Sequence, residues 1–272
     1  MNHTLPRELG HGVGTRAYWS LAPSGHLVVF VHGFNGKAAG TWIDFPRVLT
    51  AERACQGCDF VFYGYDGLYT EAYLSGTQLF KFIDALVTPP LTVLEKSLSP
   101  FPSRPNGFRF KKLTLVAHSL GAIVSRQALI EHYRNTRQWA EQIELVLFAP
   151  AHMGASLLPL LTEAFTGVAA MAAPLMSLLR FKFQVLRDLD PESKLLDKLK
   201  DDSERAILAG CSYMKAKKVL VTPKDRVVQN VRFLEDATPD IIEGATHSTI
   251  CKPRADFSKP ASELLKVLCP QI

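Results

Sequence analysis

The chain has only five cysteines among its 272 residues, and they lack the even count and regular spacing of a disulfide framework. Two of them form a CxxC, Cys55-Gln56-Gly57-Cys58, but no second ligand pair stands at the spacing of a zinc site. We therefore interpret all five as free thiols, with the CxxC in a connection between a helix and a strand. Free thiols predict a reducing compartment.

Other features are also missing. No run of five or more Lys and Arg occurs and the net charge is only +5, so we expect no nucleic-acid partner. The N-terminal residues lack the basic and then apolar segments of a secretory signal, and no apolar run reaches a clean transmembrane length. We expect a cytoplasmic protein without internal repeats, built as one α/β domain over residues 1–272.

Short apolar runs alternate with longer stretches of helical periodicity. Continuous apolar runs are typical of buried parallel strands, and their alternation with helices predicts a mostly parallel sheet covered by helices on both faces. The predicted strands are 27–31, 59–63, 113–117, 145–149, 218–222 and, more weakly, 230–234. The predicted helices are 77–86, 119–133, 194–205 and 262–268.

A serine, an acid and a histidine follow three of these strands, where parallel sheets bind their ligands. Ser119 stands in Ala117-His118-Ser119-Leu120-Gly121, between a strand and a helix, with small residues two positions before and after it. A nucleophile in such a sharp turn needs small neighbours, and the helix N-terminus adds N–H groups near developing negative charge. The alternative is a plain turn with the serine as helix cap.

Asp225 follows the fifth strand and is the best acid to orient a histidine. Asp66, which follows the second strand, is a rival, whereas Asp201 and Asp202 lie in a charged stretch that looks solvated. His247 is the best base among eight histidines, because it lies in a loop of small residues beyond the last strand.

Further residues complete the predicted site. The backbone N–H groups of Phe34 and Leu120 are expected to stabilise an oxyanion. His32 is expected to brace its loop. His118 abuts the nucleophile and is not the base; with His152 and Met153 it is a candidate for substrate contact.

These residues resemble the lipase-like α/β hydrolases, and within them the GPI-inositol-deacylase-like and SERAC1-like group. The resemblance implies an α/β-hydrolase fold, a triad of Ser119, Asp225 and His247, the oxyanion donors Phe34 and Leu120, and acyl-ester substrates that are often lipids. The matching segments are 31–34, 117–121, 150–154, 224–228 and 246–253, the last of which looks most particular to this group.

A lid or cap insertion is expected at about 153–205, since α/β hydrolases usually place one between these strands. Its part from 156 to 179 is strongly apolar and is broken by Pro159, Gly167 and Pro174. It fits a lid over an acyl-chain pocket, a core or dimer contact, or a membrane-embedded helix, for which Glu163 and Pro174 are awkward. A peripheral membrane contact through this segment also stays open, and the oligomeric state is not predicted.

The predicted reaction is two-step hydrolysis of carboxylic esters through a covalent acyl-enzyme, without a metal or organic cofactor. The same residues would serve a thioesterase, an amidase or an acyltransferase. A non-catalytic binding module on a hydrolase fold is the remaining alternative, although such a module has no reason to keep all three triad residues.

Overall fold

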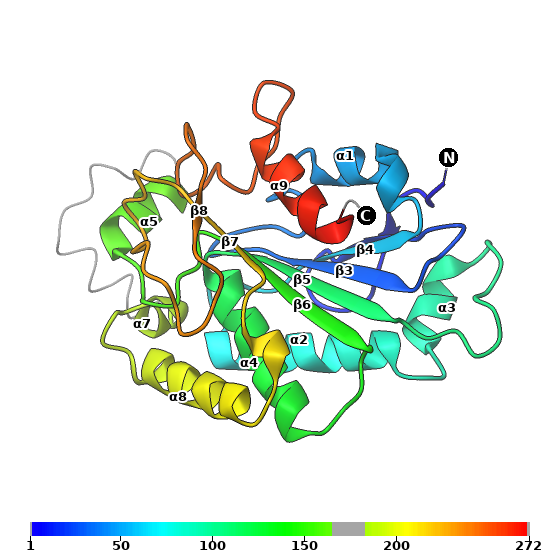
Figure 1. Cartoon of the computed structure of the whole chain (residues 1–272), viewed down its shortest axis with the longest axis horizontal. Coiled ribbons are helices and arrows are strands. Elements are labelled where there is room, and N and C mark those ends of the chain that lie inside the picture. The colour runs from blue at the N-terminus through cyan, green and yellow to red at the C-terminus, as the bar shows by residue number, and fades with distance from the viewer. Residues whose placement is uncertain (1, 165–182, 271–272) are drawn as a thin grey trace.

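The computed structural model describes residues 2–164 and 183–270, and within them an eight-stranded sheet forms the centre of the molecule (Figure 1). The strand order is β1-β2-β4-β3-β5-β6-β7-β8. The six strands β3 to β8 are parallel to one another, and β1 and β2 add an antiparallel edge beside β4. The bounds are β1 Arg7–Glu8, β2 Arg16–Tyr18, β3 His26–Val31, β4 Cys58–Tyr63, β5 Lys112–His118, β6 Gln142–Phe148, β7 Lys218–Val221 and β8 Asp240–Ile241.

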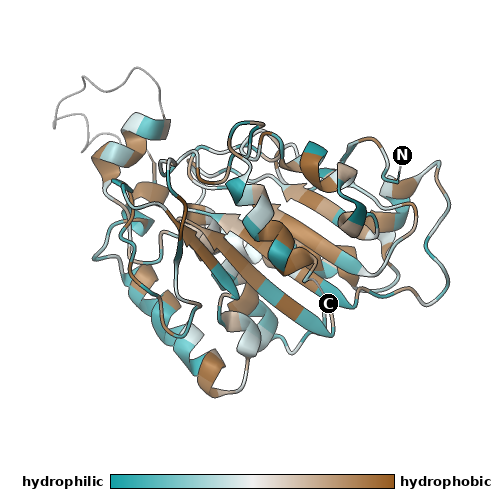
Figure 2. Cartoon of the chain, turned by 45° about the horizontal axis from the view of Figure 1, so that its top comes forward, coloured by the Kyte–Doolittle hydropathy of each residue, from teal (hydrophilic) through white to brown (hydrophobic). Residues whose placement is uncertain are grey.

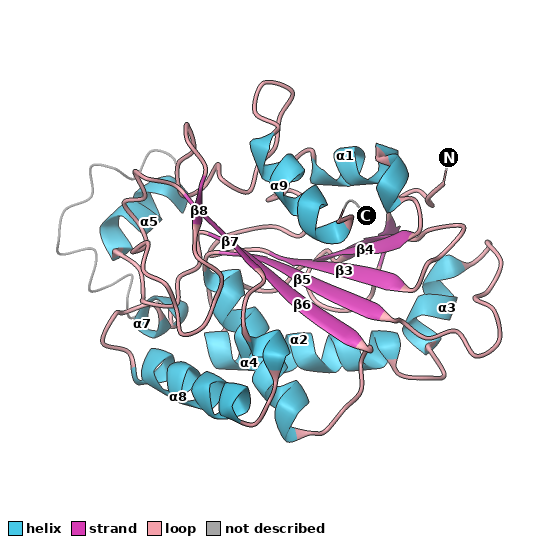
Figure 3. Cartoon of the chain, viewed as in Figure 1, coloured by secondary structure: helices cyan, strands magenta, loops and turns pink. Residues whose placement is uncertain are grey.

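Helices cover both faces of the sheet, as Figure 3 shows. Helices α1 and α9 lie on one face, and α2 and α4 pack against each other on the opposite face. The bounds are α1 Phe45–Ala51, α2 Ala72–Val87, α3 Thr92–Leu98, α4 Leu120–Arg134, α5 Leu157–Ala164, α7 Val185–Asp188, α8 Lys194–Leu208 and α9 Lys259–Leu268. Two short 3₁₀ turns lie at Arg53–Cys55 and Ser212–Met214. The first five predicted strands and all four predicted helices are therefore confirmed, with shifted ends.

The central strands are buried because helices cover both of their faces. Every residue of β3 and β4 is buried, and the central strands are mostly hydrophobic in Figure 2. Helix α8 shows the opposite pattern, with a charged outer side and buried Leu196 and Leu199. Its Ser193 cap accepts a hydrogen bond from the N–H of Leu195, which fixes where the helix begins.

The predicted strand at 230–234 is wrong, because this segment is irregular and the last strand is β8. The reason is a buried ion pair. Asp236 accepts a hydrogen bond of 2.6 Å from Arg126 in α4, and Phe233 stacks on the same guanidinium. These contacts hold the segment against α4 instead of in the sheet.

The expected insertion between β6 and β7 holds α5, α7 and α8. The apolar stretch 156–179 is described only up to Ala164, and the remainder of the predicted lid lies outside the described residues. Within the part that is described, no helix combines the length and apolar character needed to cross a membrane.

Candidate active site

Ser119 occupies the turn between β5 and α4 with a backbone φ of +53°, a value that L-residues other than glycine rarely adopt. The turn is tight enough that its neighbours must be small. A Cβ at Gly121 would lie 2.3 Å from the carbonyl oxygen of Val31, and Ala117 is fully buried. The strained turn therefore presents the Ser119 side chain at the carboxyl end of the sheet.

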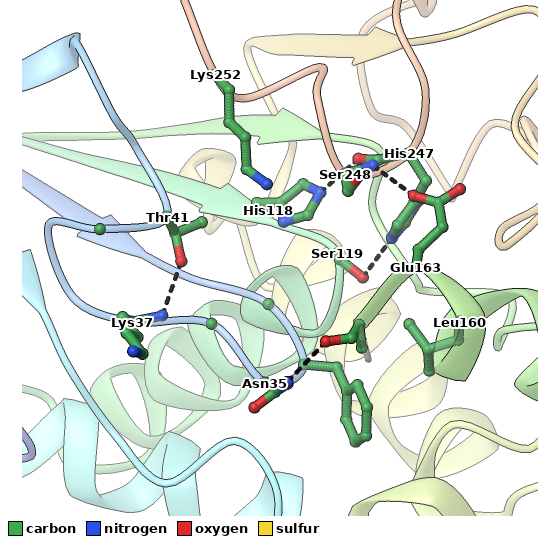
Figure 4. A pocket seen from close by; sticks show the side chains of 15 residues that line it. Asn35, Lys37, Thr41, His118, Ser119, Leu160, Glu163, His247, Ser248 and Lys252 are labelled. Carbon is green, nitrogen blue, oxygen red and sulfur yellow. Dashed lines mark hydrogen bonds between the residues drawn. The ribbon is translucent and has the colours of Figure 1, made fainter. Parts of the chain in front are cut away.

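Three side chains from separate loops form a hydrogen-bonded line. The Nε2 atom of His247 lies 2.9 Å from the Oγ atom of Ser119, and its Nδ1 atom lies 2.9 Å from Oδ2 of Asp225. Ser119 and His247 are both almost fully buried (Figure 4). An acid bound to Nδ1 leaves Nε2 free to accept the serine proton, which is the arrangement that activates a hydroxyl as a nucleophile.

Asp225 is held by its own loop as well as by the histidine. Its Oδ1 atom accepts hydrogen bonds from the backbone N–H groups of Val227 and Val228, at 2.8 and 3.0 Å. Burial tends to raise the pKa of this carboxyl, but the hydrogen bonds and the charge interaction with His247 outweigh it, and the pKa lies below its ordinary value. The acid is therefore ionised wherever the protein is folded near neutral pH.

Contacts from two neighbouring strand ends position the His247 loop. The Nε2–H group of His118 donates to the backbone carbonyl of His247 at 2.9 Å, and the Thr222 hydroxyl donates to the carbonyl of Ala245 at 2.7 Å. The carbonyl contact assigns the His118 proton to Nε2. His118 thus braces the loop of His247, a role that the sequence did not indicate.

The loop after β3 approaches the turn of Ser119 closely. A Cβ at Gly33 would lie 2.9 Å from the Cβ of Ser119, so only glycine fits. This approach brings the backbone of Phe34 to the cavity beside Ser119, where the N–H of Leu120 is the first of α4. His32 braces the loop as expected: it is buried, donates from Nδ1 to the Gly33 carbonyl and stacks on Tyr65.

A cavity of about 270 Å³ opens at Ser119. Its wall combines apolar and polar surface and includes three charged residues that the sequence analysis did not identify as functional, Lys37, Glu163 and Lys252. No pattern in the sequence marks them, because a charged side chain in a loop or on a helix is usually solvated. The described residues that line it are Gly33 to Lys37, Gly40, Thr41, His118, Ser119, Leu160, Glu163, Ala164, His247, Ser248 and Lys252.

Two predicted substrate contacts are not brought to this cavity. His152 is buried against Phe233 and accepts a hydrogen bond from Arg126, and it is absent from the described lining. Met153 is more than a third exposed and is also absent from the described lining. We therefore do not propose a substrate contact for either residue.

The rival acids have structural roles. Asp66 accepts hydrogen bonds from the N–H groups of Leu68 and Tyr69 and so closes a turn. Asp202 is buried and pairs with Arg134 at 2.7 Å, which corrects the expectation that it is solvated. Among the described residues, no three His, Cys, Asp or Glu side chains are grouped to hold a metal ion.

A protein-family model described as "Putative serine esterase (DUF676)" matches residues 23–228, which is most of the chain. The chain belongs to this family. It is therefore an ester-hydrolysing enzyme, and it has the α/β-hydrolase fold. The match supports the predicted resemblance at the level of a serine esterase, and it does not confirm the GPI-inositol-deacylase-like and SERAC1-like group. A search of curated protein sequences finds no significant match.

Solved structures with the same fold include three hydrolases. The mature lipase BlEst2 of Bacillus licheniformis has a TM-score of 0.58 at 18% identity, covering 96% of this chain and 99% of its own. Carboxyl esterase 2 of Tuber melanosporum has a TM-score of 0.56 at 14% identity, covering 97% and 85%. The peroxisomal α/β-hydrolase Lpx1 of Saccharomyces cerevisiae has a TM-score of 0.54 at 10% identity, covering 94% and 79%. At these identities the likeness establishes the fold.

Proposed function

We propose that this esterase hydrolyses carboxylic esters through a covalent acyl-enzyme on Ser119. The observation that carries the proposal is the line of two 2.9 Å contacts from Asp225 through His247 to the Ser119 hydroxyl. His247 takes the serine proton as Oγ attacks the ester carbonyl, and then gives that proton to the departing alcohol. Water attacks the acyl-enzyme by the same route in reverse and releases the acid.

The negative charge on the carbonyl oxygen needs two donors, for which we propose the backbone N–H groups of Phe34 and Leu120. Both residues adjoin Ser119, one across the close approach of Gly33 and the other along the chain. A single donor of this kind contributes about 10²- to 10³-fold to turnover. The side chains of Phe34 and Leu160 supply the apolar part of the cavity, where we place the acyl chain.

A series of 4-nitrophenyl esters from acetyl to dodecanoyl tests this proposal, with a thioester and an amide of one acyl group for comparison. We expect saturable hydrolysis of the esters, with slower turnover of the amide, because its leaving group is poorer. The series also tests the prediction of lipid substrates, which requires faster turnover of the longer chains and of phospholipid vesicles.

The matched control is Ser119→Ala, for which we expect loss of at least 10³-fold in kcat with the fold retained. A wild-type protein that is folded but turns over none of these substrates would support the alternative of a binding module.

A further inference from the structure

The cavity at Ser119 contains two cations that the hydrolytic mechanism does not use. Lys37 and Lys252 both line it, and no carboxylate of a described residue lies within ion-pair distance of either ammonium group. Some lysines elsewhere are paired: Lys218, for example, contacts Asp240 at 2.6 Å. Two positive charges beside the proposed nucleophile, neither of them paired with a described carboxylate, favour an anionic ligand.

The position of Lys252 is fixed by the loop that carries the histidine of the triad. Its neighbours Cys251 and Pro253 are both buried, so Lys252 is held between two anchored residues and is itself half-buried. Its backbone N–H donates to the carbonyl of Thr249 at 2.9 Å, which closes the turn after His247. The Lys252 side chain therefore extends from an anchored backbone position that lies close in sequence to His247, the proposed catalytic base.

The wall between Lys252 and Ser119 is polar and uncharged. His118 lines the cavity there, and burial, with the charge of Lys252 among the further causes, lowers its pKa to about 3, so the imidazole is neutral at neutral pH. Its Nε2–H group is bound to the His247 carbonyl, which leaves Nδ1 as an acceptor with no partner among the described residues. His118 therefore adds no charge of its own to the wall beside Lys252.

The one acid in the described lining stands apart from the lysines. In the view of Figure 4, Glu163 lies to one side of Ser119, with Lys252 and Lys37 to the other. The Glu163 carboxylate accepts the backbone N–H of Ser248 at 2.9 Å and so has a structural partner. The cavity is thus polarised, with positive charge on the side of the loop 35–41.

We propose that this cavity selects esters that carry an anionic group, a carboxylate or a phosphate, which binds the Lys252 ammonium with Lys37 as a second, more exposed contact. The proposal rests on the proposed esterase function and adds the charge of its substrate. Lys252 acts here as a specificity residue, because a charge-assisted contact to an anion is stronger than a neutral hydrogen bond. It has no part in the bond-breaking steps.

Two matched substrate pairs test the proposal. The first pair is 4-nitrophenyl butyrate and the mono-4-nitrophenyl ester of glutaric acid, which places a carboxylate on the acyl side. The second pair is monohexanoylglycerol and its 3-phosphate, which places a phosphate on the alcohol side. We expect kcat/KM to favour the anionic member of at least one pair by roughly tenfold. The pair that shows the preference identifies the side of the ester that faces Lys252.

Variants assign that preference to the residue. Lys252→Met is expected to remove most of it, Lys252→Arg to retain it, and Lys37→Met to reduce it less, because Lys37 is exposed. Lys81→Met is the matched control, since Lys81 is an exposed lysine of α2 outside the described lining. Raising the ionic strength should weaken the preference of the wild type, because a half-exposed charge is screened.

An absent preference in both pairs, or one that Lys252→Met leaves at its wild-type size, would overturn the proposal. Turnover of neutral esters without any anion preference would refute the anion site and leave the esterase function standing. A folded wild type that hydrolyses no ester at all would refute the proposed function itself.

Discussion

Replacing Asp225 by asparagine tests how the acid acts, because the two carboxylate oxygens have separate duties. Oδ1 accepts the N–H groups of Val227 and Val228, and Oδ2 accepts the Nδ1–H group of His247. In Asp225→Asn the amide oxygen must stay with the two backbone donors. The NH₂ group then faces Nδ1, which forces the imidazole proton to Nε2 and turns a donor toward the Ser119 hydroxyl.

A histidine with its proton on Nε2 cannot take the proton of serine. We therefore expect Asp225→Asn to lower kcat by about 10⁴-fold, which corresponds to about 5 kcal/mol of lost transition-state stabilisation. The assay is hydrolysis of 4-nitrophenyl butyrate at pH 7.5, with thermal unfolding of the same preparation. The thermal stability should change little, because the oxygen that closes the loop is kept.

Asp66→Asn is the matched control. Asp66 also follows a strand and also accepts two backbone N–H groups through Oδ1, but no described histidine is bound to it. We expect its kcat to stay near that of the wild type. A kcat for Asp225→Asn above about one tenth of the wild-type value would refute the tautomer argument.

Three further predictions concern stability and the thiols. Asp236→Asn leaves the buried Arg126 charge without its counter-ion. It should lower the free energy of unfolding by about 3–5 kcal/mol, which corresponds to a fall of roughly 6–10 °C in Tm by calorimetry. An unchanged Tm would contradict this prediction. Burial lowers the pKa of His32 to about 4 and that of His118 to about 3. In the unfolded chain these imidazoles bind a proton near pH 6.5, so the stability that the neutral imidazoles provide is fully present above that pH. The free energy of unfolding should fall by about 1.4 kcal/mol per pH unit for each imidazole toward pH 4. Urea titrations across this range measure the free energy of unfolding, and a flat pH profile would oppose the prediction. A thiol reagent should modify two cysteines of the native protein and five after unfolding, because the other three are buried; prompt native reaction of all five would contradict the described burial. The two partly exposed thiols are Cys211 and Cys269.

The sequence predicted the sheet and the strand ends well, because both depend on local patterns. The apolar run before Ser119 and the helical periodicity after it define the turn, and parallel strands bring their carboxyl ends to one edge. That is why Ser119 could be expected beside Asp225 and His247, which both lie more than a hundred residues further along the chain. The structure does bring them together, and their catalytic role stays a prediction that the experiments above address.

Long-range polar pairing was beyond the sequence. Arg126 looks like an ordinary polar position in a helix, yet it is fully buried and pairs with Asp236, which lies 110 residues further along the chain. Contacts with Arg126 hold residues 230–234 outside the sheet, and His152 is bound to Arg126 instead of lining the cavity. The N-terminal strands β1 and β2 were also missed, since two or three residues are too few for a period to show.

The most direct test of the central claim is to trap the proposed nucleophile. A fluorophosphonate reacts only with a serine whose hydroxyl is activated, and digestion with mass spectrometry locates the adduct. We predict one adduct per chain, on Ser119, with no labelling of Ser119→Ala and strongly reduced labelling of His247→Ala. An adduct on another residue, equal labelling of Ser119→Ala, or a folded and unreactive wild type would contradict the account.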